Sequence, residues 1–379
     1  MKNKDTQQAP RVDPKLWEGS FNGRENTLQQ LAPYIGKLKT GMANALIDQF
    51  TSPGDVVYDP FSGSGVVPFE SALLGRTAWA NDLNPYAYTL TRGKLEAPIS
   101  LELALKNTEA ALIEIASKAP SIDLRRVPKW VRAFFHNETL REVVAAFQVL
   151  REHKDYFLLS CLLGILHHQR PGFLSYPSSH MVPYLRDRKY PFDNFPEMYD
   201  YRDLRSRLIA KIKRAYRRSN LPNSWTNHNY RVWNRESLYV PIPNGSINAV
   251  ITSPPYFDTL SYGRDNRLRL WFLGETDWQK MDQRLSPRGN NYLNFMGAWF
   301  KEINRNLVPK GHCILIIGDY ARNGTTKNTA DLLCKLALNS TNNQFEMIDI
   351  LSDPIPDNRR SRRKTKTTII ERILVLRRL

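Results

Sequence analysis

One segment of the chain, residues 56–81, restricts its fold more than any other. Val56-Val57-Tyr58 has the pattern of a compact buried strand, and Thr77 to Asn81 has that of a second strand. Between them lie a glycine loop, Phe61 to Gly65, and a predicted helix, Val66 to Leu74. A strand, a loop, a helix and a second strand in this order predict two parallel strands joined by a right-handed crossover. The chain is therefore expected to have an α/β fold.

The remaining strand signals come only after a long interruption. They lie at 230–233, 247–252, 313–318, 345–351 and 368–376. The last two are expected to pair as a hairpin. Together with the first two strands, these segments predict a Rossmann-like sheet of seven strands.

Residues 101–225, which separate the two groups of strands, have a different character. Their apolar residues mostly repeat with the period of a helix, and one basic helix is expected at 202–218. The stretch at 171–196, which is rich in Pro, Tyr and Ser, is expected to be irregular. We therefore expect a sheet domain formed by residues 1–100 and 226–379, and a mostly helical insertion between them.

The charge balance indicates the kind of partner. The chain carries 54 Lys and Arg against 37 Asp and Glu, a formal net charge of +17, and its pI is about 9.7. An excess of this size makes polyanions natural partners, although a basic surface can also serve solubility alone. No long apolar run and no apolar secretory signal are present, so we expect no membrane span. The cysteines, Cys161, Cys313 and Cys334, are scattered without metal-ligand spacing, so we expect no metal and a reducing compartment such as the cytoplasm.

Two acidic residues stand at the ends of the first two strands. Asp59 leads into the glycine loop, whose backbone N–H groups lie at a helix start and suit a ligand. Asp82 follows the second strand, where an acid is placed to accept hydrogen bonds from both hydroxyls of a ribose. Each feature also has a plain structural interpretation, since the loop can be only a turn and Asp82 or Asn84 can serve as a helix N-cap. Taken together, the acids and the loop predict a nucleotide-type cofactor site.

A third motif, Thr252-Ser253-Pro254-Pro255-Tyr256, follows the strand expected at 247–252. Prolines are stiff and donate no hydrogen bonds, so the Ser253 hydroxyl and the proline carbonyls remain as acceptors. Such a loop can hold an amino group between fixed acceptors while Tyr256 stacks on the attached ring. The alternative is a strand terminator with a surface tyrosine.

These motifs together resemble the amino-group DNA methyltransferases. The resemblance rests on Asp-Pro-Phe-Ser-Gly-Ser-Gly at 59–65, Asn-Asp-Leu-Asn-Pro at 81–85 and Thr-Ser-Pro-Pro-Tyr at 252–256. It includes Tyr34-Ile35-Gly36-Lys37, similar to a cofactor segment that precedes the glycine loop in this family, and a closing strand at 372–377.

The resemblance covers residues 34–96 and 230–320 well, and it implies S-adenosylmethionine as the cofactor. The implied cofactor contacts are Tyr34, Lys37, Asp59, Pro60, Phe61, Ser62, Gly63, Ser64, Gly65, Asp82, Leu83, Asn84 and Glu236. The implied catalytic loop is Ser253, Pro254, Pro255 and Tyr256.

Serine at the first position of that loop resembles the cytosine-N4 subgroup, whereas the adenine-N6 subgroup more often has Asp or Asn there. Enzymes that methylate C5 of cytosine use a cysteine after a proline, and none of the three cysteines follows one. We therefore expect direct methyl transfer to the exocyclic N4 of a cytosine that is flipped out of duplex DNA. The alternatives are an adenine-N6 enzyme, an RNA guanine methyltransferase, and a basic DNA-binding protein with an inactive methyltransferase fold.

Basic side chains in four segments are candidates for contact with DNA. Two of the segments, 170–188 and 202–218, lie in the insertion. The third is a helix expected at 261–273, which also carries Arg269, and the fourth lies near residue 360. Such side chains contact phosphates and base edges, although a charge run is often only a solvated loop. The expected contacts are Arg170, Arg186, Arg188, Arg205, Lys211, Arg214, Arg264, Arg267, Arg360 and Arg363. The family resemblance further suggests duplex DNA as the substrate and a companion restriction endonuclease.

Overall fold

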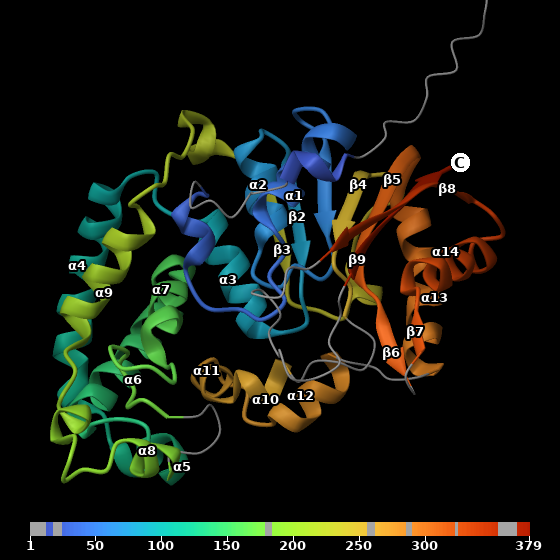
Figure 1. Cartoon of the computed structure of the whole chain (residues 1–379). Helices are drawn as coiled ribbons and strands as arrows, with labels where there is room; N and C mark the ends of the chain where they lie inside the picture. The colour runs from blue at the N-terminus through green and yellow to red at the C-terminus, as the bar shows by residue number, and fades with distance from the viewer. Residues whose placement is uncertain are drawn as a thin grey trace, which may run out of the picture.

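The structure is a computed structural model that describes residues 13–17, 25–178, 184–255, 262–285, 290–322, 325–354 and 370–379. Its centre is a mixed sheet of seven strands in the order β3-β2-β1-β4-β5-β9-β8 (Figure 1). The strands are β1 (Val56–Asp59), β2 (Thr77–Asn81), β3 (Tyr230–Trp233), β4 (Ile247–Thr252), β5 (Leu307–Gly318), β8 (Phe345–Pro354) and β9 (Ile370–Arg378). β9 runs antiparallel to β5 and β8, and the other neighbours are parallel. The predicted α/β sheet, with its final hairpin, is confirmed.

Side chains along the central strands point alternately to the two faces of the sheet, and helices cover both faces. On one face, Val57 and Ile251 pack with α1 (Thr40–Phe50), and α2 (Val66–Leu73) and α3 (Pro85–Leu95) continue this layer. On the other face, Tyr58 and Val250 pack with α13 (Asn290–Asn306) and α14 (Thr329–Ser340). The sheet is therefore the middle of three layers. Because helices cover both of its faces, a ligand site can form at the ends of its strands.

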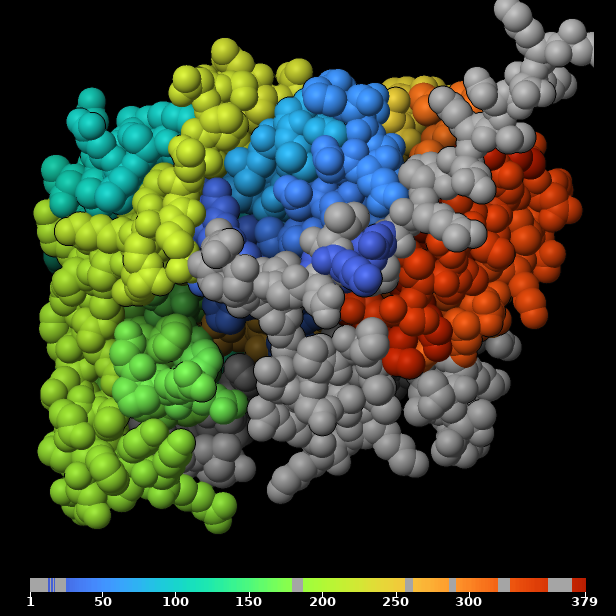
Figure 2. All heavy atoms as spheres, turned by 45° about the horizontal axis from the view of Figure 1, so that its top comes forward, coloured from blue at the N-terminus to red at the C-terminus, as the bar shows by residue number. Residues whose placement is uncertain are grey.

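Residues 101–225 form a helical layer beside α3 (Figure 1). Figure 2 shows this layer on one side of the molecule and the carboxyl-terminal strands and helices on the other. Its helices are α4 (Leu101–Lys118), α5 (Lys129–Arg132), α6 (Asn137–Glu152), α7 (Tyr156–Leu166), α8 (Tyr184–Lys189) and α9 (Leu204–Ala215). Single 3-10 turns lie at Pro14–Trp17, Thr27–Gln30, Ala119–Ser121, Leu124–Arg126, Pro196–Tyr199, Asn223–Asn227 and Ser237–Tyr239.

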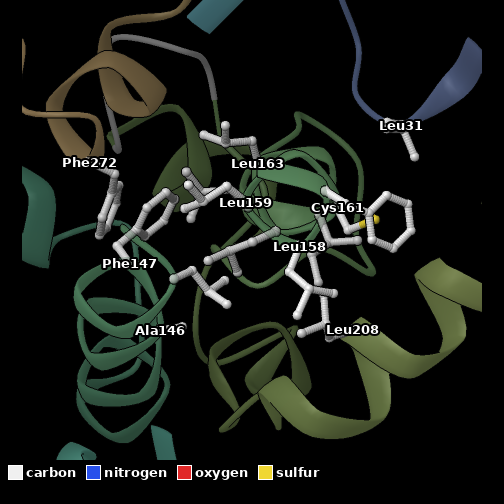
Figure 3. Close-up of a cluster of buried hydrophobic side chains, with 14 of the residues drawn as sticks. Leu31, Ala146, Phe147, Leu158, Leu159, Cys161, Leu163, Leu208 and Phe272 are labelled. Atoms are coloured by element: carbon white, nitrogen blue, oxygen red, sulfur yellow. The ribbon is translucent and has the colours of Figure 1, made fainter. Parts of the chain in front are cut away.

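Helix α7 joins this layer to the sheet domain. It is apolar on all sides, and every residue from Phe157 to Leu166 is buried, as expected for a helix surrounded by protein. Figure 3 shows Leu159 and Leu163 of α7 beside Phe147 of α6 and Phe272, with Leu208 of α9 nearby. One hydrophobic cluster runs from these residues to α2 and α3 without a break, so the insertion and the sheet domain share a core.

Several expected elements differ from those in the structure. The helix expected at 261–273 is instead α10 (Tyr262–Asp265) and α11 (Arg267–Phe272), because the backbone at Asn266, with φ −113° and ψ 15°, leaves the helical region. α12 (Trp278–Leu285) follows. The helix expected at 202–218 begins later, at Leu204, because the Asp203 side chain caps it by accepting from the Arg205 and Ser206 amides.

Two further differences concern the rest of the chain. The stretch at 171–196, expected to be irregular, contains α8, and β5 begins at Leu307, earlier than predicted. A small hairpin of β6 (Tyr320–Arg322) and β7 (Thr325–Lys327) follows β5. Over the described ranges, the structure has no helix long and apolar enough to cross a membrane.

Candidate active site

A cavity of about 260 Å³ opens where the carboxyl ends of β1, β2 and β4 meet. Most of the predicted contact residues line it: Tyr34, Lys37, Asp59, Phe61, Ser62, Gly63, Ser64, Asp82, Leu83, Asn84, Glu236, Ser253 and Pro255. Pro60, Gly65 and Pro254 do not line it, and Tyr256 lies outside the described residues. Gly63 and Ser253, far apart in the sequence, thus face one cavity.

The glycine loop depends on two left-handed residues and on α3. Gly63 has φ +51° and Gly65 has φ +74°, a region that favours glycine. A Cβ on Gly65 would lie 2.8 Å from the Thr91 Cα of α3, so the loop and that helix are in direct backbone contact. Ser62 strengthens this contact, because its hydroxyl lies 3.1 Å from the Thr91 hydroxyl.

Asp59 connects the glycine loop with the strand that carries the third motif. Its Oδ1 accepts a hydrogen bond from the Thr252 hydroxyl at 2.6 Å and one from the Phe61 amide at 3.2 Å. Burial raises the pKa of Asp59 to about 7, although both of these hydrogen bonds act to lower it. Its second oxygen, Oδ2, accepts no hydrogen bond from a described residue and is available to a ligand.

Asp82 holds the other side of the loop. Its Oδ2 accepts from the Gly63 amide at 2.8 Å, and its Oδ1 accepts from the Asn84 amide at 2.9 Å. Burial raises the pKa of Asp82 to about 6, and these two hydrogen bonds oppose the rise. The N-cap of α3 is Asn84, whose side chain accepts from the Tyr86 amide. Asp82 therefore does not serve as that cap.

Two buried donors in the cavity wall are incompletely satisfied. Ser64 Oγ has no hydrogen-bond partner among the described residues, and Asn84 Nδ2 approaches only the Tyr34 hydroxyl, whose pKa it acts to lower. Buried polar atoms are rarely left unpaired in native proteins. These two atoms indicate that the cavity takes a polar ligand.

Aromatic rings lie against the glycine loop at the cavity. The Tyr34 ring lies 3.1 Å from the position of a Cβ on Gly63, and it stacks on Tyr262 with ring centroids 6.2 Å apart. Tyr34 also packs against Tyr86, whose hydroxyl donates to the Pro33 carbonyl at 2.6 Å. A planar group in the cavity would meet these rings.

Sequence reasoning did not identify Tyr262 or Arg284, which reach the cavity from α10 and α12. Arg284 Nη2 lies 3.0 Å from Glu236 Oε1, and both side chains are about half exposed, at 44% and 47%. The further lining residues that were not predicted are Gly36, Leu38, Val66, Val67, Asn81, Arg235, Ser237, Leu238, Leu285 and Phe295. Gly36 and Asn81 belong to motifs already described, and Val66 and Val67 follow the glycine loop directly. No local motif marks the others, which the tertiary fold brings to the cavity.

Lys37 lines the cavity but is committed to the fold. Its Nζ donates to the Gln29 carbonyl at 2.7 Å, and burial lowers its pKa. Gln29 in turn donates to Glu70 of α2 at 2.8 Å and accepts from Lys94 of α3 at 2.6 Å. Lys37 therefore belongs to a buried polar network behind the glycine loop.

The basic candidates lie in different surroundings. Arg170, Arg188 and Arg214 are exposed, whereas Arg205 pairs with an acid and Lys211 with a backbone carbonyl. Arg264 lies 3.5 Å from Asp265. Arg267 Cζ lies 4.1 Å from the centroid of the Trp130 ring. Arg360, Arg363 and the side chain of Arg186 lie outside the described residues.

Arg269 contradicts the expectation of a phosphate-facing helix. It is only 4% exposed, and it donates to the Leu163 carbonyl at 3.2 Å and the His167 carbonyl at 2.7 Å. The reason is that α11 packs into the core of the insertion, so this guanidinium caps the end of α7 rather than meeting solvent.

Two family models match separate parts of the chain. Residues 247–371 match the DNA methylase family, whose model is named for N6 and N4 methylation. Residues 34–149 match the D12 class of N6 adenine-specific DNA methyltransferases. Each match covers less than half of the chain. Both matches are to models of amino-group DNA methyltransferases, which depend on S-adenosylmethionine. The first model spans N6 and N4 methylation and the second names only N6 of adenine, so together they do not resolve the base.

Solved structures resemble the chain at low identity. TrmN from Thermus thermophilus is 11% identical over 94% of this chain and 53% of its own length, with a TM-score of 0.37. A SAM-dependent methyltransferase from Methanosarcina mazei is 10% identical over 88% and 97%, with a TM-score of 0.33. The rRNA methyltransferase AviRa from Streptomyces viridochromogenes is 11% identical over 98% and 95%, with a TM-score of 0.32. The chain spans about half the length of TrmN, and no curated protein matches it.

Proposed function

We propose that the chain transfers a methyl group from S-adenosylmethionine to the exocyclic N4 of cytosine in duplex DNA. The observation that carries this proposal is the cavity shared by Gly63 and Ser253, since a methyl donor and a target amine must meet in one place. The two family matches support DNA as the substrate class.

The residues of the cavity fit S-adenosylmethionine, which supplies an electrophilic methyl group on a sulfonium centre. Asp59 Oδ2 would accept a hydrogen bond from the ammonium group of the methionine part, and Asp82 would accept from the ribose hydroxyls. Ser64 Oγ, which is unpaired, and Asn84 Nδ2 are placed to meet its polar groups. Glu236 would accept from the adenine amino group while Arg284 orients its carboxylate.

The target loop would act through its acceptors. The lone pair of an exocyclic amine is delocalised into the base, so the free amine is a poor nucleophile. A hydrogen bond from the amine to Ser253 Oγ, which lines the cavity, would favour a tetrahedral nitrogen with its lone pair directed at the methyl group. The carbonyl of Pro254, the next residue, is the second proposed acceptor, although Pro254 itself does not line the cavity. Transfer would then be direct: the N–CH3 bond forms as the sulfonium S–CH3 bond breaks, S-adenosylhomocysteine leaves, and the methylated amine gives its surplus proton to solvent. Positioning with preorganised acceptors would supply most of the rate. The base must leave the duplex to reach this loop, and Tyr256 is proposed to stack on it.

The second candidate is N6 of adenine, which the D12 match favours. That match, at 34–149, covers the cofactor residues Asp59 and Asp82, whereas the loop that would hold the amine lies within the match at 247–371. Because the loop proposed to hold the amine lies outside the D12 match, that match carries little information on base choice. Serine at position 253, rather than Asp or Asn, supports cytosine.

Analysis of methylated DNA decides between the bases. Plasmid DNA treated with the chain and S-adenosylmethionine is digested to nucleosides and analysed by mass spectrometry. We expect N4-methylcytosine. N6-methyladenine alone would reject the cytosine proposal, and a product only in structured RNA would reject DNA as the substrate.

The domain assignment and the biological setting also belong to this proposal. Residues 1–100 and 226–379 would form the catalytic domain, and residues 101–225 would recognise the DNA sequence. A cytoplasmic enzyme with a companion restriction endonuclease is the setting that the family resemblance supports. Sequencing the methylated plasmid would report the recognised site.

A further inference from the structure

The basic helix expected at 202–218 uses two of its proposed DNA-contact side chains internally. On α9, Arg205 pairs with Glu109 at 2.5 Å, and Lys211 donates to the Gln30 carbonyl at 2.7 Å. The carboxyl end of α9 also points away from α10–α12, which cover the cavity (Figure 1). α9 is therefore poorly suited to hold DNA at the cavity.

A different group of cations faces solvent at the end of the molecule where α10–α12 lie (Figure 1). Arg126, Lys129 and Arg132 lie in the 3-10 turn Leu124–Arg126 and in α5, and we call these three residues the α5 cluster. All three are exposed, and none forms a close ion pair or a side-chain hydrogen bond with a described residue, although the charge of Arg126 helps to lower the pKa of Asp123. Their neighbour Arg125 differs, because Asp123 neutralises it at 2.9 Å.

The backbone beneath the α5 cluster is fixed. Val131 and Phe134 are completely buried, and Phe135 is nearly so. The Phe134 carbonyl accepts from the Tyr176 amide at 2.7 Å, which ties this turn to the next loop of the insertion. Charged side chains on a rigid base lose less conformational freedom when they bind than side chains on a mobile loop.

An aromatic contact connects the α5 cluster with the segment that covers the cavity. Trp130 of α5 lies under the Arg267 guanidinium, with Cζ 4.1 Å from the ring centroid. Arg267 begins α11, directly after α10, whose Tyr262 lines the cavity. Figure 1 shows α5 and α10–α12 at the same end of the molecule.

We infer that the α5 cluster, continued by Arg267, binds the phosphate backbone of the duplex from which the target base enters the cavity. Unpaired arginine and lysine side chains are complementary to phosphates, and such contacts set the register of a protein on DNA without reading sequence. This inference rests on the proposed function, because it takes DNA as the substrate.

The salt dependence of DNA binding tests the α5 cluster. We would compare the wild-type chain with Lys129→Ala/Arg132→Ala, using a labelled duplex oligonucleotide at several salt concentrations. Each phosphate contact contributes about 0.9 to the slope of log affinity against log salt, so the slope should become shallower by about 2. Affinity at low salt should fall at least about tenfold, while S-adenosylmethionine affinity and thermal midpoint stay unchanged.

The matched control is Lys213→Ala/Arg217→Ala, which removes the same charge from exposed positions at and just beyond the carboxyl end of α9. It should keep the wild-type slope. An unchanged slope in the α5 variant, or an equal loss in the control, would overturn the inference. Loss of binding to structured RNA with unchanged binding to duplex DNA would also overturn it. A wild-type chain that neither binds nor methylates duplex DNA would instead refute the proposed function.

Discussion

The Thr252 hydroxyl donates to Asp59 Oδ1 across 2.6 Å, so the strand that leads to the target loop is bonded to the strand that leads to the glycine loop. Both side chains are buried, at 0% and 4% exposure. The bond lies at the boundary between the proposed sites for methyl donor and target amine. Because this hydrogen bond lowers the pKa of Asp59, the charge of Asp59 depends on the strand that leads to Ser253.

The pH dependence of cofactor binding tests this relationship. Burial raises the pKa of Asp59 to about 7, and an ionised Asp59 is needed to pair with the ammonium group of S-adenosylmethionine. Affinity should therefore weaken as the pH falls below about 7, by up to about tenfold for each pH unit. Calorimetric titration between pH 5.5 and 8.5 measures this.

Two substitutions of Thr252, one without and one with a hydroxyl, test whether its hydrogen bond influences this pKa. Because its hydrogen bond lowers the pKa of Asp59, Thr252→Val should raise that pKa further and move the midpoint to higher pH. Thr252→Ser, which keeps the hydroxyl, should leave the pH midpoint of cofactor binding at its wild-type value. A midpoint that Thr252→Val does not move would show that the bond has no influence on the cofactor.

The glycine loop makes a prediction about stability. Gly65→Ala places a Cβ against the backbone of α3 at a positive φ, so it should lower the free energy of unfolding by about 2–4 kcal/mol. Gly54→Ala is the control, because φ is +91° there but a Cβ meets nothing within 4 Å. That variant should lose only about 1 kcal/mol. Equal losses by urea denaturation would mean that contact with Thr91 is unimportant.

The sequence predicted the parts of the molecule that local pattern determines. Period and turn residues identified β1, β2 and β4, and the acids at the strand ends followed because parallel strands place their carboxyl ends at one edge. Asp59, Asp82 and Ser253 could therefore be assigned to one site before any coordinates.

The parts that depend on distant contacts could not be predicted. Tyr262 and Arg284 have no motif, and they reach the cavity only because α10–α12 fold back over it. Arg269 looked like its neighbours Arg264 and Arg267, but burial of α11 against α7 gives it a different partner. A charge in a sequence does not reveal whether its partner is a phosphate, an acid or a backbone carbonyl.

Arg269 makes the second prediction about stability. Arg269→Met keeps the length of the side chain but leaves the Leu163 and His167 carbonyls without their buried donor. The free energy of unfolding should fall by about 2–4 kcal/mol. Arg267→Met, a half-buried arginine two residues away, should lose about 1 kcal/mol or less. Denaturant unfolding of both variants checks this, and similar losses would mean that the buried hydrogen bonds contribute little.

The Glu236–Arg284 pair should affect the cofactor rather than the fold. Because both side chains are about half exposed, the pair stabilises the protein by no more than about 1 kcal/mol. Arg284→Ala should weaken S-adenosylmethionine binding by about tenfold if it orients the carboxylate that meets adenine. Arg284→Lys should recover part of the affinity. In Glu236→Ala, further loss of Arg284 should have no added effect, and an additive loss in calorimetry would contradict the coupling.

The central claim is that the Ser253 loop acts on the amine while the glycine loop holds the donor. The most direct measurement is the single-turnover rate of labelled methyl transfer into duplex DNA by Ser253→Ala, together with its affinity for S-adenosylmethionine. The account predicts a rate at least about 100-fold below wild type, with affinity unchanged within about twofold. Transfer at the wild-type rate, or a loss explained entirely by weaker cofactor binding, would contradict it.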